Sequence, residues 1–131
     1  KKSIEKFIKI NNLNKKIFLK GFEKNKNLIF KNADLFINAS LWEGLPNALV
    51  QSINYNVYPI CSDAPGGNME VIKNGNLGLY FKTNDEIDLQ KKIKKFLNKK
   101  LKLNSKNRIK HLHNYTELKS NLRYLKTLNK F

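Results

Sequence analysis

The sequence has few of the residues that build covalent or metal-held frameworks. Its 131 residues include one cysteine, Cys61, and no CxxC pair or cluster of histidine with cysteine. This excludes an intrachain disulfide framework and a zinc-finger type of site, and it favours a reducing compartment. No run approaches the ~18 to 20 apolar residues of a membrane-spanning helix, and residues 1–3 lack the apolar stretch of a signal peptide. We therefore expect a cytoplasmic protein.

Arginine and acidic residues are also scarce. Of the 26 basic residues 24 are lysine, against 10 acidic residues, so the formal net charge is +16. Residues 85–131 hold 14 basic and 4 acidic residues and form the most basic part of the chain. Such a charge indicates an acidic partner, either a nucleic acid or an anionic membrane surface, although a compositional bias of the source genome would also produce it. We expect no nucleic acid partner, because arginine is scarce and an aromatic and basic platform is lacking.

Apolar patterns of two kinds alternate along the chain. Short continuous apolar runs predict strands at 16–20, 34–38, 58–61 and 77–81. Amphipathic or turn-bounded segments predict helices over 3–10, 25–32, 46–54, 68–73, 85–97, 104–113 and 116–129, with Pro46 as the first residue of its helix. This alternation is typical of an α/β fold with a parallel sheet covered by helices on both faces. We expect one domain over 1–131, with a core at 1–98 and a basic helical segment at 99–131.

Ligands of such sheets bind outside the carboxyl ends of the strands, which directs attention to residues 20–24, 38–46 and 62–68. The segment 39–47 follows a strand and opens a helix, whose free N–H groups attract phosphate or another anion. Glu43 puts a carboxylate there. It either complements the positive end of the helix dipole, or accepts hydrogen bonds from a ligand's hydroxyls while the backbone binds the ligand's phosphate.

Three blocks of sequence resemble a known family in their order and spacing. They are residues 17–22 (IFLKGF), 32–52 (NADLFINASLWEGLPNALVQS) and 62–78, which includes SDAPGGNMEVI. The chain resembles the C-terminal, donor-binding domain of retaining GT-B glycosyltransferases, the glycosyl transferases group 1 family. The resemblance spans roughly residues 3–98. It implies a Rossmann-like domain, incomplete at its N-terminal side, that binds a nucleotide-sugar without a metal or other cofactor.

The resemblance also assigns roles to individual residues. Glu43 matches the first carboxylate of the family's E-x7-E motif, beside the donor sugar, and is the expected catalytic residue. The second glutamate, which binds the ribose hydroxyls, is replaced here by Gln51, whose amide can still bond a diol but without charge assistance. The remaining expected substrate-binding residues border the nucleobase pocket (Gly21, Phe22) or lie near the sugar and diphosphate (Gly44, Leu45, Pro46, Asn47). Glu70, Gly66 and Gly67 match family positions with either a site or a scaffold role.

The resemblance implies a larger enzyme than this chain. In the family, the domain begins with a strand and helix that supply an Arg and a Lys for the diphosphate, and nothing before Lys16 resembles that unit. We therefore expect a partner in the family's N-terminal, acceptor-binding domain, and no turnover by this chain alone. The expected reaction is transfer of a sugar, with UDP as the favoured nucleotide, to a glycan or lipid-linked acceptor of polysaccharide or lipopolysaccharide synthesis at the inner face of the membrane. The alternative is a basic module without catalysis that binds nucleic acid or an anionic membrane.

Four further residues receive structural interpretations. Cys61 ends an apolar run and is expected to be a small buried hydrophobe, and Asp63 is expected to form a turn. His111 and His113 lie two residues apart in a lysine-rich helical segment, so they point in different directions. We expect these histidines to lie on a solvated helix.

Overall fold

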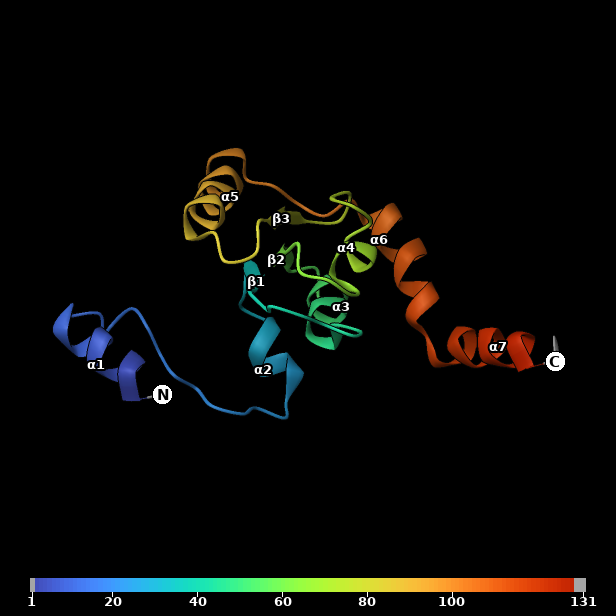
Figure 1. Cartoon of the computed structure of the whole chain (residues 1–131), viewed down its shortest axis with the longest axis horizontal. Coiled ribbons are helices and arrows are strands. Elements are labelled where there is room, and N and C mark those ends of the chain that lie inside the picture. Colours follow the sequence, from blue (N-terminus) through green and yellow to red (C-terminus); the bar gives the residue numbers. More distant parts are fainter. Residues whose placement is uncertain (1, 129–131) are drawn as a thin grey trace.

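The computed structural model describes residues 2–128, and its centre is a parallel β-sheet (Figure 1). Three strands, β1 (Leu35–Asn38), β2 (Tyr58–Ser62) and β3 (Leu79–Phe81), lie in the order β1-β2-β3, and both pairings are parallel. Ile37 pairs with Ile60, and Cys61 with Tyr80. The arrangement confirms the predicted α/β, Rossmann-like class and three of the four predicted strands.

Seven α-helices and one short 3-10 helix accompany the sheet within residues 2–128. Each predicted helix is found, with bounds that differ by one or a few residues, and residue 129 lies outside the described part. The helices are α1 (Lys2–Ile10), α2 (Lys26–Phe30), α3 (Asn47–Asn54), α4 (Asn68–Val71), α5 (Glu86–Lys99), α6 (Ser105–Leu112), η1 (His113–Tyr115) and α7 (Glu117–Leu128). Pro46 is the N-cap residue of α3, not its first helical residue, because its ψ of 79° lies outside the helical range.

The predicted strand at 16–20 is wrong. Residues 17–20 form no strand, and Ile17, Phe18 and Leu19 are 39%, 64% and 41% exposed. An apolar run indicates that a segment tends to be buried, but a strand also needs a neighbouring strand that hydrogen-bonds its backbone. Within residues 2–128 this segment pairs with no strand. Figure 1 shows α1 and the following segment (blue) lying apart from the sheet.

Helices cover both faces of the sheet. On one face, buried Cys61 of β2 packs with Leu49 and Ile53 of α3 and with Val71 of α4. On the other face, the ring of Tyr58 packs against Phe96 of α5, with the ring centres 5.2 Å apart. The sheet therefore lies between α3 and α4 on one face and α5 on the other.

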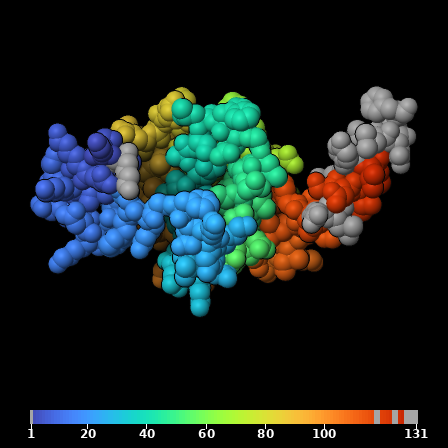
Figure 2. All heavy atoms as spheres, turned by 90° about the horizontal axis from the view of Figure 1, so that it is seen from below, coloured from blue at the N-terminus to red at the C-terminus, as the bar shows by residue number. Residues whose placement is uncertain are grey.

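The basic C-terminal segment also contributes to the packing. The buried cluster around Leu49, Ile53 and Cys61 is also packed by side chains of this segment, namely Leu103, Leu112 and Tyr115. Arg108 Nη1 donates to the carbonyl oxygens of Ile53 (3.3 Å) and Asn54 (2.8 Å), which caps the C-terminus of α3. Figure 2 shows the N-terminal residues (blue) and the α6–α7 segment (orange to red) at opposite ends of the molecule. The division into a core at 1–98 and a segment at 99–131 stays a prediction.

Candidate functional site

Two of the three loops singled out by the sequence meet at the carboxyl ends of β1 and β2. The Glu43 N–H donates to the Pro65 carbonyl (3.2 Å), and the Gly67 N–H donates to the Gly44 carbonyl (3.0 Å). Glu43 and Gly66 form a parallel bridge. A Cβ at Gly66 would overlap the carbonyl oxygen of Glu43. Gly66 and Gly67 therefore have a scaffold role, because they let the backbone of their loop lie directly on the backbone of Glu43 and Gly44.

The carboxylate of Glu43 is half-buried beside this junction and is held by two side chains. Ser40 Oγ lies 2.6 Å from Glu43 Oε1, and Asn38 Nδ2 lies 3.4 Å from the same oxygen. Ser40 Oγ also lies 2.8 Å from Asn38 Oδ1. The hydroxyl has one proton and can donate to only one of these two oxygens at a time. The contact to the carboxylate is the shorter one, as expected for an acceptor that carries charge. The carboxylate lies outside the ends of the parallel strands, where such folds bind ligands.

A second layer of polar groups lies beneath. Asn68, which begins α4 and is fully buried, donates from Nδ2 to the Ser62 carbonyl (3.0 Å) and Oγ (3.3 Å). Its Oδ1 accepts from Asn38 Nδ2 at 3.3 Å. Ser62 Oγ donates to the Ser40 carbonyl at 2.6 Å. Sequence reasoning assigned no role to Asn38, Ser62 or Asn68, although a signal was present: Asn38 and Ser62 are the last residues of β1 and β2.

The N-terminus of α3 lies next to Glu43. Pro46 is buried, and the Asn47 N–H donates to the Leu45 carbonyl at 2.9 Å, so a local turn uses this predicted donor. The N–H groups of Gly44 and Leu45 make no hydrogen bond within residues 2–128. Two backbone donors of exposed residues beside a carboxylate therefore have no bond within the described part of the chain.

The remaining predicted site residues lie elsewhere. Gln51 is half-buried on α3 and lines a cavity of about 430 Å³ between α3 and the α6–η1 segment, with Asn54 and His113. Gly21 has a φ of +73°, and the side chain of Phe22 is 89% exposed. Within residues 2–128 no hydrogen bond joins residues 20–24 to the two loops around Glu43. The structure thus brings together the residues from 43 to 47 but not the expected nucleobase residues.

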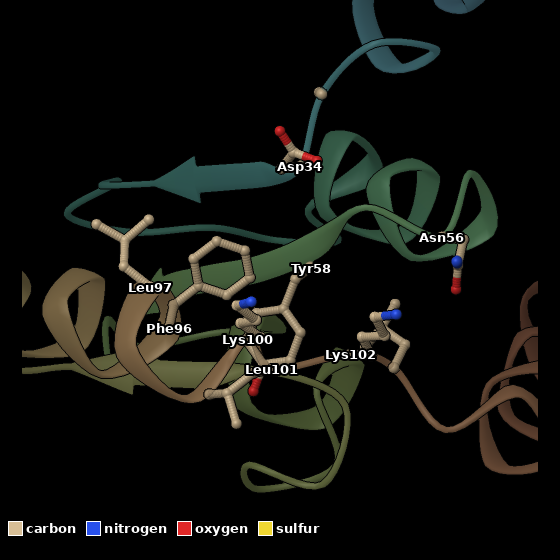
Figure 3. Close-up of a pocket in the computed structure, with 10 residues that line it drawn as sticks. Asp34, Asn56, Tyr58, Phe96, Leu97, Lys100, Leu101 and Lys102 are labelled. Carbon is tan, nitrogen blue, oxygen red and sulfur yellow. The ribbon is translucent and has the colours of Figure 1, made fainter.

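A cavity of about 470 Å³ lies at the opposite end of the sheet (Figure 3). Asp34 and Tyr58 line it from the amino ends of β1 and β2, and Phe96, Lys100 and Lys102 line it from α5 and the following loop. Burial raises the pKa of the Tyr58 hydroxyl, which keeps it protonated. Because Glu43 lies at the carboxyl ends, this cavity is separate from the candidate site.

Comparison with known proteins identifies the family of this chain. The family model described as "Glycosyl transferases group 1" matches residues 1–117. The chain belongs to the glycosyl transferases group 1 family. The parallel sheet of this glycosyl transferases group 1 chain, and the position of Glu43 after the carboxyl end of β1, were expected from the order of apolar runs and loops in the sequence.

Three curated relatives are similar to parts of this chain. An uncharacterized glycosyltransferase of Methanocaldococcus jannaschii is 32% identical over 72 residues, 55% of this chain and 18% of the relative. The GalNAc-alpha-(1->4)-GalNAc-alpha-(1->3)-diNAcBac-PP-undecaprenol alpha-1,4-N-acetyl-D-galactosaminyltransferase of Campylobacter jejuni is 33% identical over 107 residues, 78% of this chain and 30% of the relative. The UDP-Gal:alpha-D-GlcNAc-diphosphoundecaprenol alpha-1,3-galactosyltransferase of Escherichia coli is 34% identical over 74 residues, 56% and 19%. The matched part is less than a third of each relative's length.

Proposed function

We propose that this chain is the donor-binding part of a glycosyltransferase that uses a nucleotide-sugar, with a UDP-sugar as the first candidate. The observation that supports this most is the pairing of Glu43 with Ser40 at the carboxyl end of the sheet, directly before the N-terminus of α3. A carboxylate accepts hydrogen bonds from sugar hydroxyls, and the adjacent open N–H groups of Gly44 and Leu45 attract a diphosphate.

The site residues have separate proposed roles toward the sugar, the diphosphate and the nucleoside. Glu43 binds and orients the transferred sugar, and the Gly44 and Leu45 N–H groups neutralise charge that develops on the departing diphosphate. Pro46 is the N-cap of α3, and the bond from the Asn47 N–H to the Leu45 carbonyl holds the turn that carries these two N–H groups. Gln51 bonds the ribose hydroxyls as a neutral amide, which requires its side chain to turn from the cavity beside α6–η1 toward the site when the donor binds. Gly21 and Phe22 border the nucleobase, which requires the exposed segment 20–24 to approach the site when the donor binds.

The wider reaction is also a proposal. The names of two relatives specify acceptors linked to undecaprenol through a diphosphate, so we propose transfer of a sugar, with retention and without a metal, to a lipid-linked glycan of surface polysaccharide synthesis. Acceptor choice would reside in an N-terminal domain of a longer protein of the GT-B architecture. An acceptor of this kind implies work at the inner face of a membrane, to which the lysines of α5 would be attracted. Within residues 2–128 no helix is long and apolar enough to cross a bilayer.

The test is a titration of the ¹⁵N-labelled chain with UDP, GDP and UDP-galactose, followed by amide chemical shifts. We expect the amide signals of Gly44 and Leu45 to shift in a saturable way with the nucleotides of one base, uracil or guanine. The Gln51→Ala variant should bind that nucleotide more weakly, because the ribose loses a hydrogen-bonding partner. Asn98→Ala is the control, since Asn98 is an exposed amide on α5 and does not line the cavity that Gln51 lines. A folded sample that shows no saturable shift near Glu43 with any nucleotide would contradict the proposal.

A further inference from the structure

The polar groups beneath Glu43 are buried in the core of the chain. Asn68 is 0% exposed and Ser62 is 1% exposed. A buried amide costs free energy unless all of its donors and acceptors are bonded, so such groups persist only where their bonds are made. The bonds of Asn68 lead in one direction to the backbone of β2 and in the other to Asn38, and from there to Glu43.

The geometry fixes one carboxylate oxygen and leaves the other open. Ser40 Oγ and Asn38 Nδ2 both approach Glu43 Oε1, at 2.6 Å and 3.4 Å. Glu43 Oε2 makes no hydrogen bond within the part of the chain that the structure describes. Two donors on one oxygen set the rotation of the carboxylate, and the second oxygen is then free to bond a ligand.

The network is not needed to join the two loops. Two backbone hydrogen bonds and the Glu43–Gly66 bridge already do so. The amides of Asn38 and Asn68 instead transmit the position of β2 to the carboxylate, because Asn68 is anchored on Ser62. A rigid second layer of this kind is what holds a reacting group in a productive geometry.

We propose that Asn38 and Asn68 are positioning residues for the donor sugar. Asn68, anchored on Ser62, orients the amide of Asn38, and Asn38 together with Ser40 holds Glu43 Oε1 so that Oε2 faces a sugar hydroxyl. The proposal rests on the proposed function of Glu43. It goes beyond it by naming the groups that prepare the carboxylate before any ligand binds.

The first test needs no ligand. Three-bond NMR couplings of the Glu43 side chain report whether it occupies one rotamer. We expect one rotamer in the unsubstituted chain and rotamer averaging in Asn68→Ala and Asn38→Ala. Asn76→Ala is the control, because the Asn76 amide is exposed and bonds only the Lys73 carbonyl in its own turn. Unchanged amide shifts at Leu49 and Ile60 would show that the core of each variant is intact.

The second test measures the contribution of the sugar to binding. The ratio of the Kd for UDP to the Kd for UDP-galactose or UDP-N-acetylgalactosamine measures how much the contacts to the sugar contribute to the binding free energy. We expect Glu43→Ala to abolish any preference for the sugar nucleotide. Asn38→Ala and Asn68→Ala should lower the ratio about tenfold, the size of one lost hydrogen bond to a charged group, while the Kd for UDP itself stays unchanged.

The outcomes separate the two proposals. If Glu43→Ala leaves the ratio unchanged, the proposed role of Glu43 fails. If Glu43→Ala acts as expected but the couplings and the ratio of both asparagine variants match those of the control, only the positioning proposal is overturned. If Asn68→Ala does not fold, the half-buried Asn38 still decides the question, since its replacement breaks the same path at the carboxylate.

Discussion

His111 Nε2 lies 2.8 Å from the carbonyl oxygen of Val71, and this hydrogen bond ties α6 to the short helix α4. His111 is 9% exposed, and its ring lies against Tyr115, with the ring centres 5.2 Å apart. Burial lowers the pKa of His111 and outweighs the opposing bond to Val71. Lys73 adds to the lowering, whereas the nearby Glu70 carboxylate opposes it.

This burial makes the stability of the fold depend on pH. A histidine whose pKa is lower in the folded chain than in the unfolded chain binds its proton more readily after unfolding. Its contribution to stability is complete above the unfolded pKa of about 6.5 and is lost as the pH falls through the lower folded value. We expect the free energy of unfolding to fall between pH 7.5 and pH 5, and His111→Gln, which keeps a donor for Val71, to reduce that fall. Urea unfolding at both pH values is the measurement, with exposed His113→Gln as control. An equal fall in both variants would contradict the assignment.

Gly66 is predicted to be intolerant of a side chain. Its φ is +114°, and a Cβ there would overlap the carbonyl oxygen of Glu43. Gly66→Ala should therefore destabilise the fold by about 3 kcal/mol, at the upper end of ordinary substitutions. Gly44 is the matched control, since it lies in the facing loop and a methyl group there would meet no atom within 4 Å. Urea unfolding of Gly66→Ala and Gly44→Ala tests this, and equal losses would refute the steric explanation.

The sequence predicted the three apolar runs that pair in the sheet, and it failed for the apolar run that has no neighbouring strand within residues 2–128. β1 and β2 are apolar runs that each have a neighbour. Residues 16–20 are just as apolar, but composition carries no information about which backbone will accept their hydrogen bonds. The same limit applies to Phe22, whose expected role beside the nucleobase depends on a long-range placement that no local pattern encodes.

His111 shows a second limit. We expected a solvated helix because lysines surround it, yet it is buried. Arg108, His111, Leu112 and Tyr115 recur at helical spacing and form the face of the α6–η1 segment that packs on the core or caps α3. A hydropathy pattern does not detect this face, because several of its side chains end in polar atoms although their stems pack on the core.

The candidate site was predicted through a motif, not through its supporting contacts. Glu43 was found because it begins a recognisable spacing, and the two loops were found because they follow strands. Asn68 could not be found in this way, because its partners Ser62 and Asn38 lie 6 and 30 residues away in sequence. The path from Asn68 to Glu43 exists only once β1 and β2 are paired.

Cys61 is predicted to be unreactive in the folded chain. Its side chain is 0% exposed, and burial, with a smaller effect of Asp63, raises its pKa to about 12. The thiolate is the reactive form, so both access and ionisation are suppressed. Modification by iodoacetamide at pH 8 should be slow in buffer and fast in denaturing urea, and its dependence on urea should follow unfolding measured by circular dichroism. Rapid modification in buffer without urea would contradict the buried placement.

The outer face of α5 is predicted to bind anionic membranes. Lys91, Lys94 and Lys95 are exposed on it, and Ile87 and Leu97, each 62% exposed, lie among them, while Ile93 and Phe96 are half-buried. Near an anionic surface each lysine contributes about 1 kcal/mol, so replacing the three lysines by glutamine should weaken binding by about 3 kcal/mol, or more than a hundredfold.

Sedimentation with vesicles that contain phosphatidylglycerol measures this binding. Replacing Lys2, Lys6 and Lys9 of α1 by glutamine is the control, because it removes the same charge from exposed positions elsewhere. A loss confined to the α5 variant supports a defined membrane face, since net charge is equal in the two variants. Equal losses would show that binding follows net charge alone, and the excess of lysine would then be a property of composition and not of this surface.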